Sequence, residues 1–477
     1  MAQVSGAKYD IISLMLAKLH ARIGDFWWYS LMLFCACRAA DLLNAFVGLW
    51  LVPKYVGPTE LGAVQPLTQF ANFLAIPVAA FANTFRNELT RLSIGKEYGK
   101  LKTLMRGVFA ATAVFLFLAI ITARFLLPAF LERIRIVEGS LGLIIIAASF
   151  VGAVAPIYSN ALQALKKFKA QSLLSIVGAP IRLIAMLIAM PFRAITGYFV
   201  GQAATPVFSI AASVVSLRKE LSVKAEPYWD KEVFQRFARL FGIFVIIGIV
   251  DGFYLLTEST VLRQRLPDLD SAGYYMATRF SEIASFLAAT LSFTIFPFTA
   301  EKATAGEALR PLIVKAISAN AIFCLVLALP FMFFGRQILL ILPHGDQYAT
   351  YWWAIPWLIG ITFLTSIIIF FVTAEISADR FKFTRWYIPI DLIYPVLLLL
   401  ITGYGYYAHL LPSKWAEFLS THNIRSLDAM LWWATAITAL RAICCFVAIT
   451  REKLEADTRT TANNSTATST TQSSTCR

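Results

Sequence analysis

The stretch CRAADLLNAFVGLWLV, residues 37–52, carries Asp41 deep inside a hydrophobic run of membrane-spanning length. A second run, IIGIVDGFYLLTESTVL at residues 246–262, carries Asp251 in the same way. A charge near the centre of a bilayer costs roughly 2.5 to 3.5 kcal/mol on insertion scales, so such residues normally face a protein interior or a wet cavity. Both aspartates are therefore expected to face protein or water.

Each run also carries a stripe of polar or small residues. The two stripes are Arg38, Asp41, Asn44 and Gly48 in the first run, and Asp251, Tyr254 and Glu258 in the second. Spacings of three, four and seven place residues on a single face of a helix. Two equivalent polar stripes in two parts of one chain suggest a transporter whose site lies between two halves.

The composition is that of a membrane protein. The 477 residues are 58% hydrophobic and only 15% charged, with a mean hydropathy of +0.67, whereas roughly a quarter of the residues in soluble proteins are charged. We therefore expect an all-α polytopic membrane protein. No phosphate-binding loop of the type G-x-x-x-x-G-K-[ST] and no long soluble segment are present, which argues against an ATPase or another enzyme.

Hydropathy predicts twelve spans of about 20 residues or more in two six-helix halves around a central cavity. The predicted spans are 27–52, 62–85, 104–128, 140–165, 171–190 and 194–216, followed by 240–262, 273–297, 313–335, 351–374, 387–405 and 428–450. With both termini cytoplasmic, Lys and Arg concentrate in the inside segments, as the positive-inside rule requires. The excess of Lys and Arg in cytoplasmic segments accounts for the net charge of +14, so no nucleic-acid partner is expected.

The same reading divides the chain into five parts. They are an amphipathic cytoplasmic N-terminus (1–26), an N-terminal half (27–216), a cytoplasmic linker (217–239), a C-terminal half (240–450) and a Ser/Thr-rich tail expected to be disordered (451–477). An even number of spans gives the two halves the same orientation, as in transporters built from parallel repeats. Prolines inside the spans, such as Pro77, permit kinks.

Residues 51–101, LVPKYVGPTELGAVQPLTQFANFLAIPVAAFANTFRNELTRLSIGKEYGKL, resemble the opening helical hairpin of polysaccharide-transport proteins. In that group an outside turn of the type GP-x-x-LG-x leads into the second helix, and an arginine follows at its cytoplasmic end. The matching residues here are Gly57, Pro58, Leu61, Gly62 and Arg86. Residues 342–364 are similar to the loop and tenth span of the same group.

The resemblance implies membership of the multidrug/oligosaccharidyl-lipid/polysaccharide (MOP) flippase superfamily. Twelve spans fit the O-antigen and exopolysaccharide branch and also the drug-exporting branch. In the drug-exporting branch an acidic residue in the first helix is typically the cation-coupling group, and Asp41 occupies a comparable place. The resemblance does not identify the substrate.

Three arginines within spans are candidate contacts for an anionic substrate: Arg38, Arg182 and Arg279. A guanidinium suits this role because its planar fork binds phosphate through two hydrogen bonds and stays charged. Arg182 has no acidic residue within one helical turn. Arg38 with Asp41, and Arg279 with Glu282, are spaced by three residues, so each is alternatively a structural pair within its helix.

Four carboxylates are candidate groups for coupling to a proton or sodium gradient: Asp41, Asp251, Glu258 and Glu282. Burial raises the pKa of a carboxyl group and allows it to load and release a proton near neutral pH. Arg441 and Asp391, in the last two spans, are interpreted instead as a structural pair between helices. No cofactor or metal is predicted, because the cysteines and histidines lack metal-ligand spacing.

Together these features predict a flippase of the bacterial cytoplasmic (inner) membrane. The expected substrate is a polyprenyl-pyrophosphate-linked oligosaccharide for surface polysaccharide export, moved by alternating access and driven by an ion gradient. Membrane lipids, a coupling proton or sodium ion, a polysaccharide polymerase and glycosyltransferases are the expected partners. The alternative is a cation-coupled multidrug antiporter of the same superfamily, for which an acidic, aromatic cavity is expected.

Overall fold

The computed structural model describes residues 42–94, 96–135, 139–165, 167–304, 307–378, 380–402 and 427–448. These residues form helices and the turns between them, with no strand in the described ranges. The predicted all-α class is confirmed. Arg38 and Asp41, like the amphipathic N-terminus and the tail, lie outside the described residues.

The helices of the first part of the chain are η1 (Val47–Leu51), α2 (Val52–Tyr55), α3 (Pro58–Leu74), α4 (Ile76–Ile94), α5 (Tyr98–Arg133), α6 (Gly139–Ala164), α7 (Phe168–Ala189), α8 (Ala194–Ser216) and α9 (Arg218–Leu221). Those of the second part are α10 (Lys231–Arg265), α11 (Asp268–Thr304), α12 (Arg310–Leu340), α13 (Gly345–Tyr348), η2 (Ala349–Tyr351), α14 (Ala354–Ser377) and α15 (Thr384–Thr402). A last helix covers Leu427–Ala448.

Several of these helices can cross a membrane by length and composition. Seven of the described helices qualify: Tyr98–Arg133, Ile144–Leu162, Ala194–Ser216, Lys231–Arg265, Arg310–Leu340, Ala354–Ser377 and Leu427–Ala448. A bent pair, Pro58–Leu74 with Ile76–Arg86, makes an eighth when it is counted as one span. The predicted spans 273–297 and 387–405 correspond to α11 and α15, and the fifth span to the shorter apolar helix Leu173–Ala189 within α7.

The second predicted span is bent in the middle. Its two parts, α3 and α4, meet at Ala75 and are inclined to each other by 57°. Pro77 is the second residue of α4, and proline has no N–H with which to continue the hydrogen-bond ladder. The kink that the sequence permits at Pro77 is therefore present. It divides the span into two helices, α3 and α4, which pack against different neighbours.

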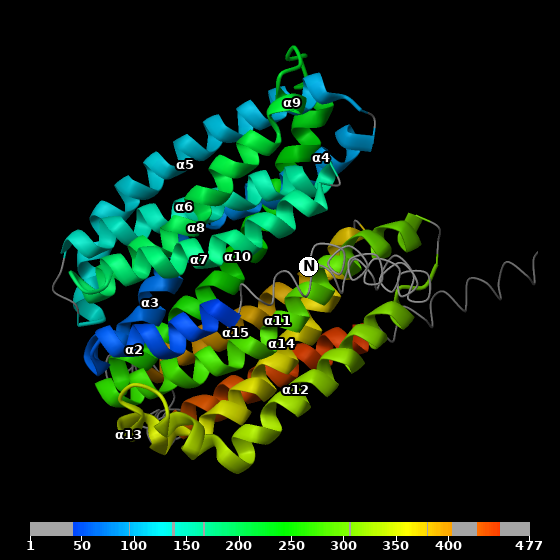
Figure 1. The fold of residues 1–477 in the computed structure, drawn as a ribbon. Coiled ribbons are helices and arrows are strands. Elements are labelled where there is room, and N and C mark those ends of the chain that lie inside the picture. The colour runs from blue at the N-terminus through cyan, green and yellow to red at the C-terminus, as the bar shows by residue number, and fades with distance from the viewer. Residues whose placement is uncertain are drawn as a thin grey trace, which may run out of the picture.

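Packing divides the helices into two groups, with α10 between them. In the N-terminal group, α6 packs on α4 and α8, and α8 packs on α7. In the C-terminal group, α11 and α12 pack on α14. Figure 1 shows two adjacent bundles: one is mainly cyan to green, and the other, green to red, has the blue helices α2 and α3 beside it. Across the boundary, α3 packs against α10 and α11, and α4 packs against α10.

Helix α10 contacts both groups. Near its start, the rings of Phe237 and Phe241 lie 5.0 and 5.5 Å from the ring of Phe81 on α4. Further along, Gly248 and Gly252 face the bend of the second span. A Cβ on Gly248 would lie 2.8 Å from an atom of Ile76, and a Cβ on Gly252 would lie 2.7 Å from another atom of the same side chain. Small residues allow helices in a membrane to approach closely, and here they seat α10 against the bend.

The segment before α10 is bound to the N-terminal group. The N–H of Glu226 donates to the carbonyl of Gly99 over 3.2 Å, and the hydroxyl of Thr103 donates to the carbonyl of Glu226 over 2.6 Å. The side chain of Asp230 then accepts from the N–H of Val233 over 2.7 Å and caps α10. Because of this cap, α10 begins at Lys231, whereas the predicted linker continued to residue 239.

Charged residues join the two groups at one end of the bundle. We call this the outer end, because the topology predicted from the charge distribution places its turns, α2–α3 and α10–α11, outside. The opposite end is the inner end. Arg263, with a side chain only 1% exposed, donates to Asp268 over 2.7 Å and to the carbonyl of Ile134, beyond α5, over 3.2 Å. Arg135 donates to the same carboxylate over 3.1 Å. We call these three side chains, Arg263, Asp268 and Arg135, the outer clasp.

The outer clasp lies where α3 meets α11. A Cβ on Gly62 would lie 2.8 Å from the Cβ of Ser271 and 3.2 Å from Nη1 of Arg263. Ser271 itself is 2% exposed. The two groups are therefore in close contact at the outer end through α3, α11 and the clasp.

Replacing Gly248 with leucine is expected to destabilise the protein, because the new side chain would overlap Ile76. Overpacking of this kind costs about 1–3 kcal/mol, and the melting temperature of the detergent-solubilised protein measures it. The matched control is Gly242→Leu on the same helix, where no atom lies within 4 Å of the new Cβ. Equal melting temperatures for the two variants would contradict the close packing of α10 on the bend.

Replacing Asp268 with asparagine is expected to loosen the outer end, because one carboxylate binds both arginines of the clasp. In a cysteine-free background, labelling of Ser271→Cys by a membrane-impermeant maleimide should become several-fold faster. Asp346→Asn, an exposed carboxylate on α13 at the same end, is the control and should leave the rate unchanged. An unchanged rate in the Asp268 variant would show that the clasp does not hold the outer end together.

Candidate functional site

A charged cluster lies between the two groups, below the outer clasp. Arg279 of α11 donates through Nη1 to Glu282, one turn along the same helix, and through Nη2 to the amide oxygen of Gln65 on α3. Both distances are 2.8 Å. The predicted pairing of Arg279 with Glu282 is present, and Gln65 extends it from the C-terminal group to the N-terminal group.

The stem of Arg279 is held by small and aromatic neighbours. A Cβ on Gly48 of η1 would lie 3.1 Å from Cδ of Arg279, so the glycine leaves room for the arginine. The guanidinium carbon lies 4.7 Å from the centre of the Tyr275 ring, a cation–π contact. Gly48 belongs to the first polar stripe, and a π-helical turn such as η1 often marks a functional site.

A second arginine, Arg182 on α7 of the N-terminal group, lies within electrostatic range of this cluster. The charges of Arg279 and Glu282 both act on its guanidinium. Its Nε atom is buried without a hydrogen-bond partner in the part of the chain that the structure describes. We call Arg182, Arg279 and Glu282 the basic cluster, since it holds two guanidinium groups and one carboxylate.

The charges of the basic cluster favour an anion. Arginine stays protonated in proteins, so both guanidinium groups carry a charge. Among the described residues of the cluster, Glu282 is the one carboxylate that offsets them, and the Nε of Arg182 has no hydrogen-bond partner in those residues. Glu282 has 39% of its side chain exposed and Arg279 has 15%, so the carboxylate is the more accessible member of the pair. Chemically, the cluster can accept a phosphate or carboxylate group.

Asp251 lies in a second cluster, inside the C-terminal group. Its carboxylate accepts a hydrogen bond of 2.9 Å from the hydroxyl of Tyr387 on α15 and lies 3.4 Å from Nη2 of Arg441 on the last helix. Arg441 also forms an ion pair with Asp391, as the sequence predicts. We call Asp251, Asp391 and Arg441 the acidic cluster, because it holds two carboxylates and one guanidinium.

The second polar stripe faces the acidic cluster. The ring of Tyr254 lies 4.9 Å below the guanidinium carbon of Arg441, and its hydroxyl is 3.3 Å from Thr438. Glu258, one turn further, accepts a hydrogen bond of 3.1 Å from Tyr274 and interacts electrostatically with Arg441. The stripe thus points toward α15 and the last helix, whereas the sequence suggests a site between the two halves. The glycines that pack on the bend, Gly248 and Gly252, lie on the neighbouring face of α10, beside the stripe.

The structure brings three predicted site residues together in the basic cluster and places Asp251 and Glu258 by Arg441. Arg38 and Asp41 lie outside the described residues; Asn44 of the same stripe has a buried Oδ1 with no partner among them. Sequence reading missed Gln65 and Tyr387, neutral residues that become significant only through partners 214 and 136 positions away. The only feature of the sequence that could have identified them is a polar side chain within a predicted span.

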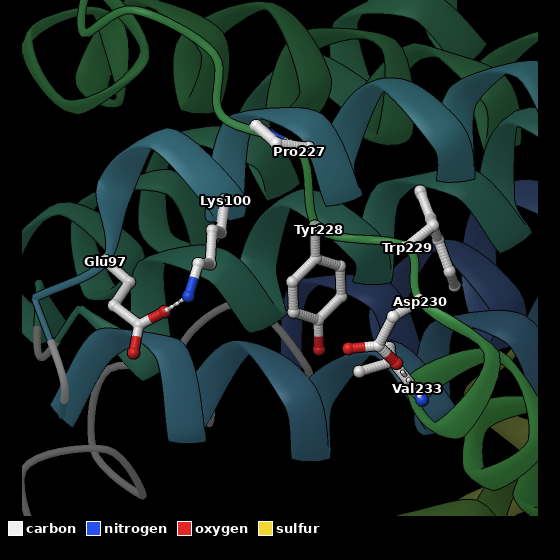
Figure 2. Close-up of a pocket in the computed structure, with 7 residues that line it drawn as sticks. All are labelled: Glu97, Lys100, Pro227, Tyr228, Trp229, Asp230 and Val233. Carbon is white, nitrogen blue, oxygen red and sulfur yellow. Dashed lines mark hydrogen bonds and ion pairs between the residues drawn. The ribbon is translucent and has the colours of Figure 1, made fainter.

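A pocket at the inner end lies away from both clusters. It has a volume of about 270 Å³ and lies between the start of α5 and the segment before α10. Figure 2 shows Tyr228 and Trp229 beside the ion pair of Glu97 and Lys100. Tyr228 donates to Glu88 of α4 over 2.6 Å, which indicates a structural role in holding the linker. Within the described ranges, no three His, Cys, Asp or Glu residues are placed to hold a metal ion.

Solved membrane transporters share this fold. One is the inward-facing conformation of a multidrug resistance MATE family transporter of the MOP superfamily, with a TM-score of 0.62, 11% identity, and coverage of 89% of this chain and 96% of that chain. A Vibrio cholerae MATE transporter variant has a TM-score of 0.60, 15% identity, and coverage of 92% and 97%.

A third is a MOP superfamily transporter from Pyrococcus furiosus, for which reverse polarity of the binding pocket suggests a different function. Its TM-score is 0.60, with 13% identity and coverage of 91% of this chain and 97% of that chain. No protein-family model and no curated protein matches the sequence. At these identities the likeness shows the fold alone, which this chain shares with these membrane transporters.

Proposed function

We propose that this protein flips a polyprenyl-pyrophosphate-linked oligosaccharide across the bacterial cytoplasmic membrane, using an ion gradient. The observation that supports this most is that Arg182 of the N-terminal group lies within electrostatic range of Arg279 and its partner Glu282 in the C-terminal group. A pyrophosphate is a compact anion with several oxygens, and guanidinium groups bind such oxygens through paired hydrogen bonds. The sugar would occupy the space between the groups, while the lipid tail stays in the bilayer.

The acidic cluster supports coupling to a cation. With two carboxylates for one guanidinium, it retains an excess negative charge that a proton or sodium ion can neutralise. Asp251 has 42% of its side chain exposed, whereas Asp391 is fully buried, so Asp251 is the member that an ion can reach. The two clusters would then serve different ligands, an anionic substrate and a coupling cation.

Cation-coupled multidrug antiport is the second candidate. The likeness to MATE family multidrug transporters and the acidic cluster both fit this function. An organic cation requires negative or aromatic surroundings, however, and the cluster between the two groups has a positive excess. The two candidates therefore predict opposite effects of the arginines.

The experiment that tests the proposal is deletion of the gene in its host, with lipid-linked oligosaccharides quantified in each leaflet. Loss should cause them to accumulate on the cytoplasmic face. Arg182→Ala and Arg279→Ala should each restore export about tenfold less well than wild type, because a hydrogen bond to a charged group contributes about 1.5–3 kcal/mol. Arg193→Ala, an exposed arginine in the turn after α7, is the matched control. Full export in both arginine variants would reject the proposed substrate contact.

Asp251→Asn should uncouple transport from the ion gradient. Asparagine can still accept from Tyr387 but carries no charge that a cation could neutralise, so an imposed proton or sodium gradient should no longer accelerate flipping in proteoliposomes. Asp428→Asn, an exposed carboxylate on the last helix, should leave the acceleration unchanged. Retained acceleration in Asp251→Asn would exclude this residue from coupling.

A further inference from the structure

We propose that Glu282 and Gln65 occupy the place of the substrate's anionic group on Arg279 in the empty protein, and that substrate binding displaces them. This inference rests on the proposed function and deepens it. It assigns Glu282 a positioning role as an internal competitor of the substrate, in place of the ion-coupling role that its sequence position suggests.

The geometry around Arg279 supports displacement. The two terminal nitrogens of the guanidinium each donate to one oxygen at 2.8 Å, one from Glu282 and one from Gln65. Two oxygens on the two terminal nitrogens resemble the arrangement that a guanidinium makes with one phosphate group. In the empty protein, these side chains therefore satisfy donors that would otherwise be left without partners in a membrane interior.

The two acceptors can be exchanged at small cost. Glu282 has 39% of its side chain exposed, so its carboxylate can turn toward open space and be solvated there. Gln65 is neutral and half-buried, and its hydrogen bond is the weaker of the two because only the donor is charged. A diphosphate carries more negative charge than Glu282, and Arg182, whose Nε has no hydrogen-bond partner among the described residues, lies within electrostatic range of Arg279. These differences favour the ligand over the internal partners.

Displacement has a consequence at the outer end. The hydrogen bond from Arg279 to Gln65 joins α11 to α3, the same two helices that meet at Gly62 and Ser271 beneath the outer clasp. A ligand that takes both terminal nitrogens removes this bond between the two groups. Occupancy of the basic cluster and closure of the outer end thus both involve Arg279, which adds to the outer clasp in the empty protein and so favours the closed outer end.

Equilibrium binding of undecaprenyl diphosphate to the purified full-length protein tests the inference. Glu282→Gln removes the competing charge and preserves the shape of the side chain, so it should bind the lipid about fivefold to tenfold more tightly than wild type. Glu60→Gln, an exposed carboxylate on α3, changes the net charge equally and should bind as wild type does. Inorganic pyrophosphate and undecaprenyl monophosphate, used as competitors, distinguish recognition of a free diphosphate from recognition of a lipid headgroup.

The outcomes separate this inference from the proposed function. If Arg279→Ala binds the lipid as tightly as wild type, the proposed substrate contact fails, and the displacement with it. If binding depends on Arg279 but Glu282→Gln binds no more tightly than wild type, only the displacement is overturned. Glu282→Ala provides a second test with the same expected direction, and monodisperse elution of each variant shows that it is folded. In flipping assays, displacement also requires that Glu282→Gln lower KM without raising kcat.

Discussion

An arginine keeps its charge in the interior of a membrane protein, and the helices around it must therefore supply oxygen atoms. Three arginines impose this constraint here. Arg263 binds the α10–α11 turn to the end of α5, Arg279 binds α11 to α3, and Arg441 binds the last helix to α10 and α15. Each contact joins segments that are distant in the sequence, and together they determine which helices meet around the candidate site.

The hairpin of α10 and α11 connects these contacts. It carries Asp251 of the acidic cluster on one arm and Arg279 of the basic cluster on the other, and the outer clasp forms at its turn. A displacement of the hairpin would change all three at once. Glycines on α10 hold the same hairpin against the bend of the second span. This arrangement gives a physical route by which a cation at one cluster and an anion at the other can influence the closure of the outer end.

Local patterns in the sequence predicted part of this structure. The hydropathy predicted the helices, and Pro77 predicted the bend. The three-residue spacing predicted the pairing of Arg279 with Glu282. Each of these features depends on neighbours within one helix. Contacts between helices were harder to predict from the sequence. The direction of the Asp251 stripe depends on Tyr387 and Arg441, 136 and 190 residues away, and spacing within α10 contains no information about them. The pair of Arg441 and Asp391 could be predicted because two opposite charges in adjacent spans have few other ways to be neutralised.

The most direct test of the anion site is transport by the purified protein in proteoliposomes, with two substrates compared side by side. An undecaprenyl-diphosphate-linked oligosaccharide should be translocated at a rate that falls about tenfold or more in Arg182→Ala, while ethidium, an organic cation, should not be transported. Ethidium transport that is unaffected or increased in Arg182→Ala, without translocation of the lipid-linked sugar, would contradict this account and favour multidrug antiport.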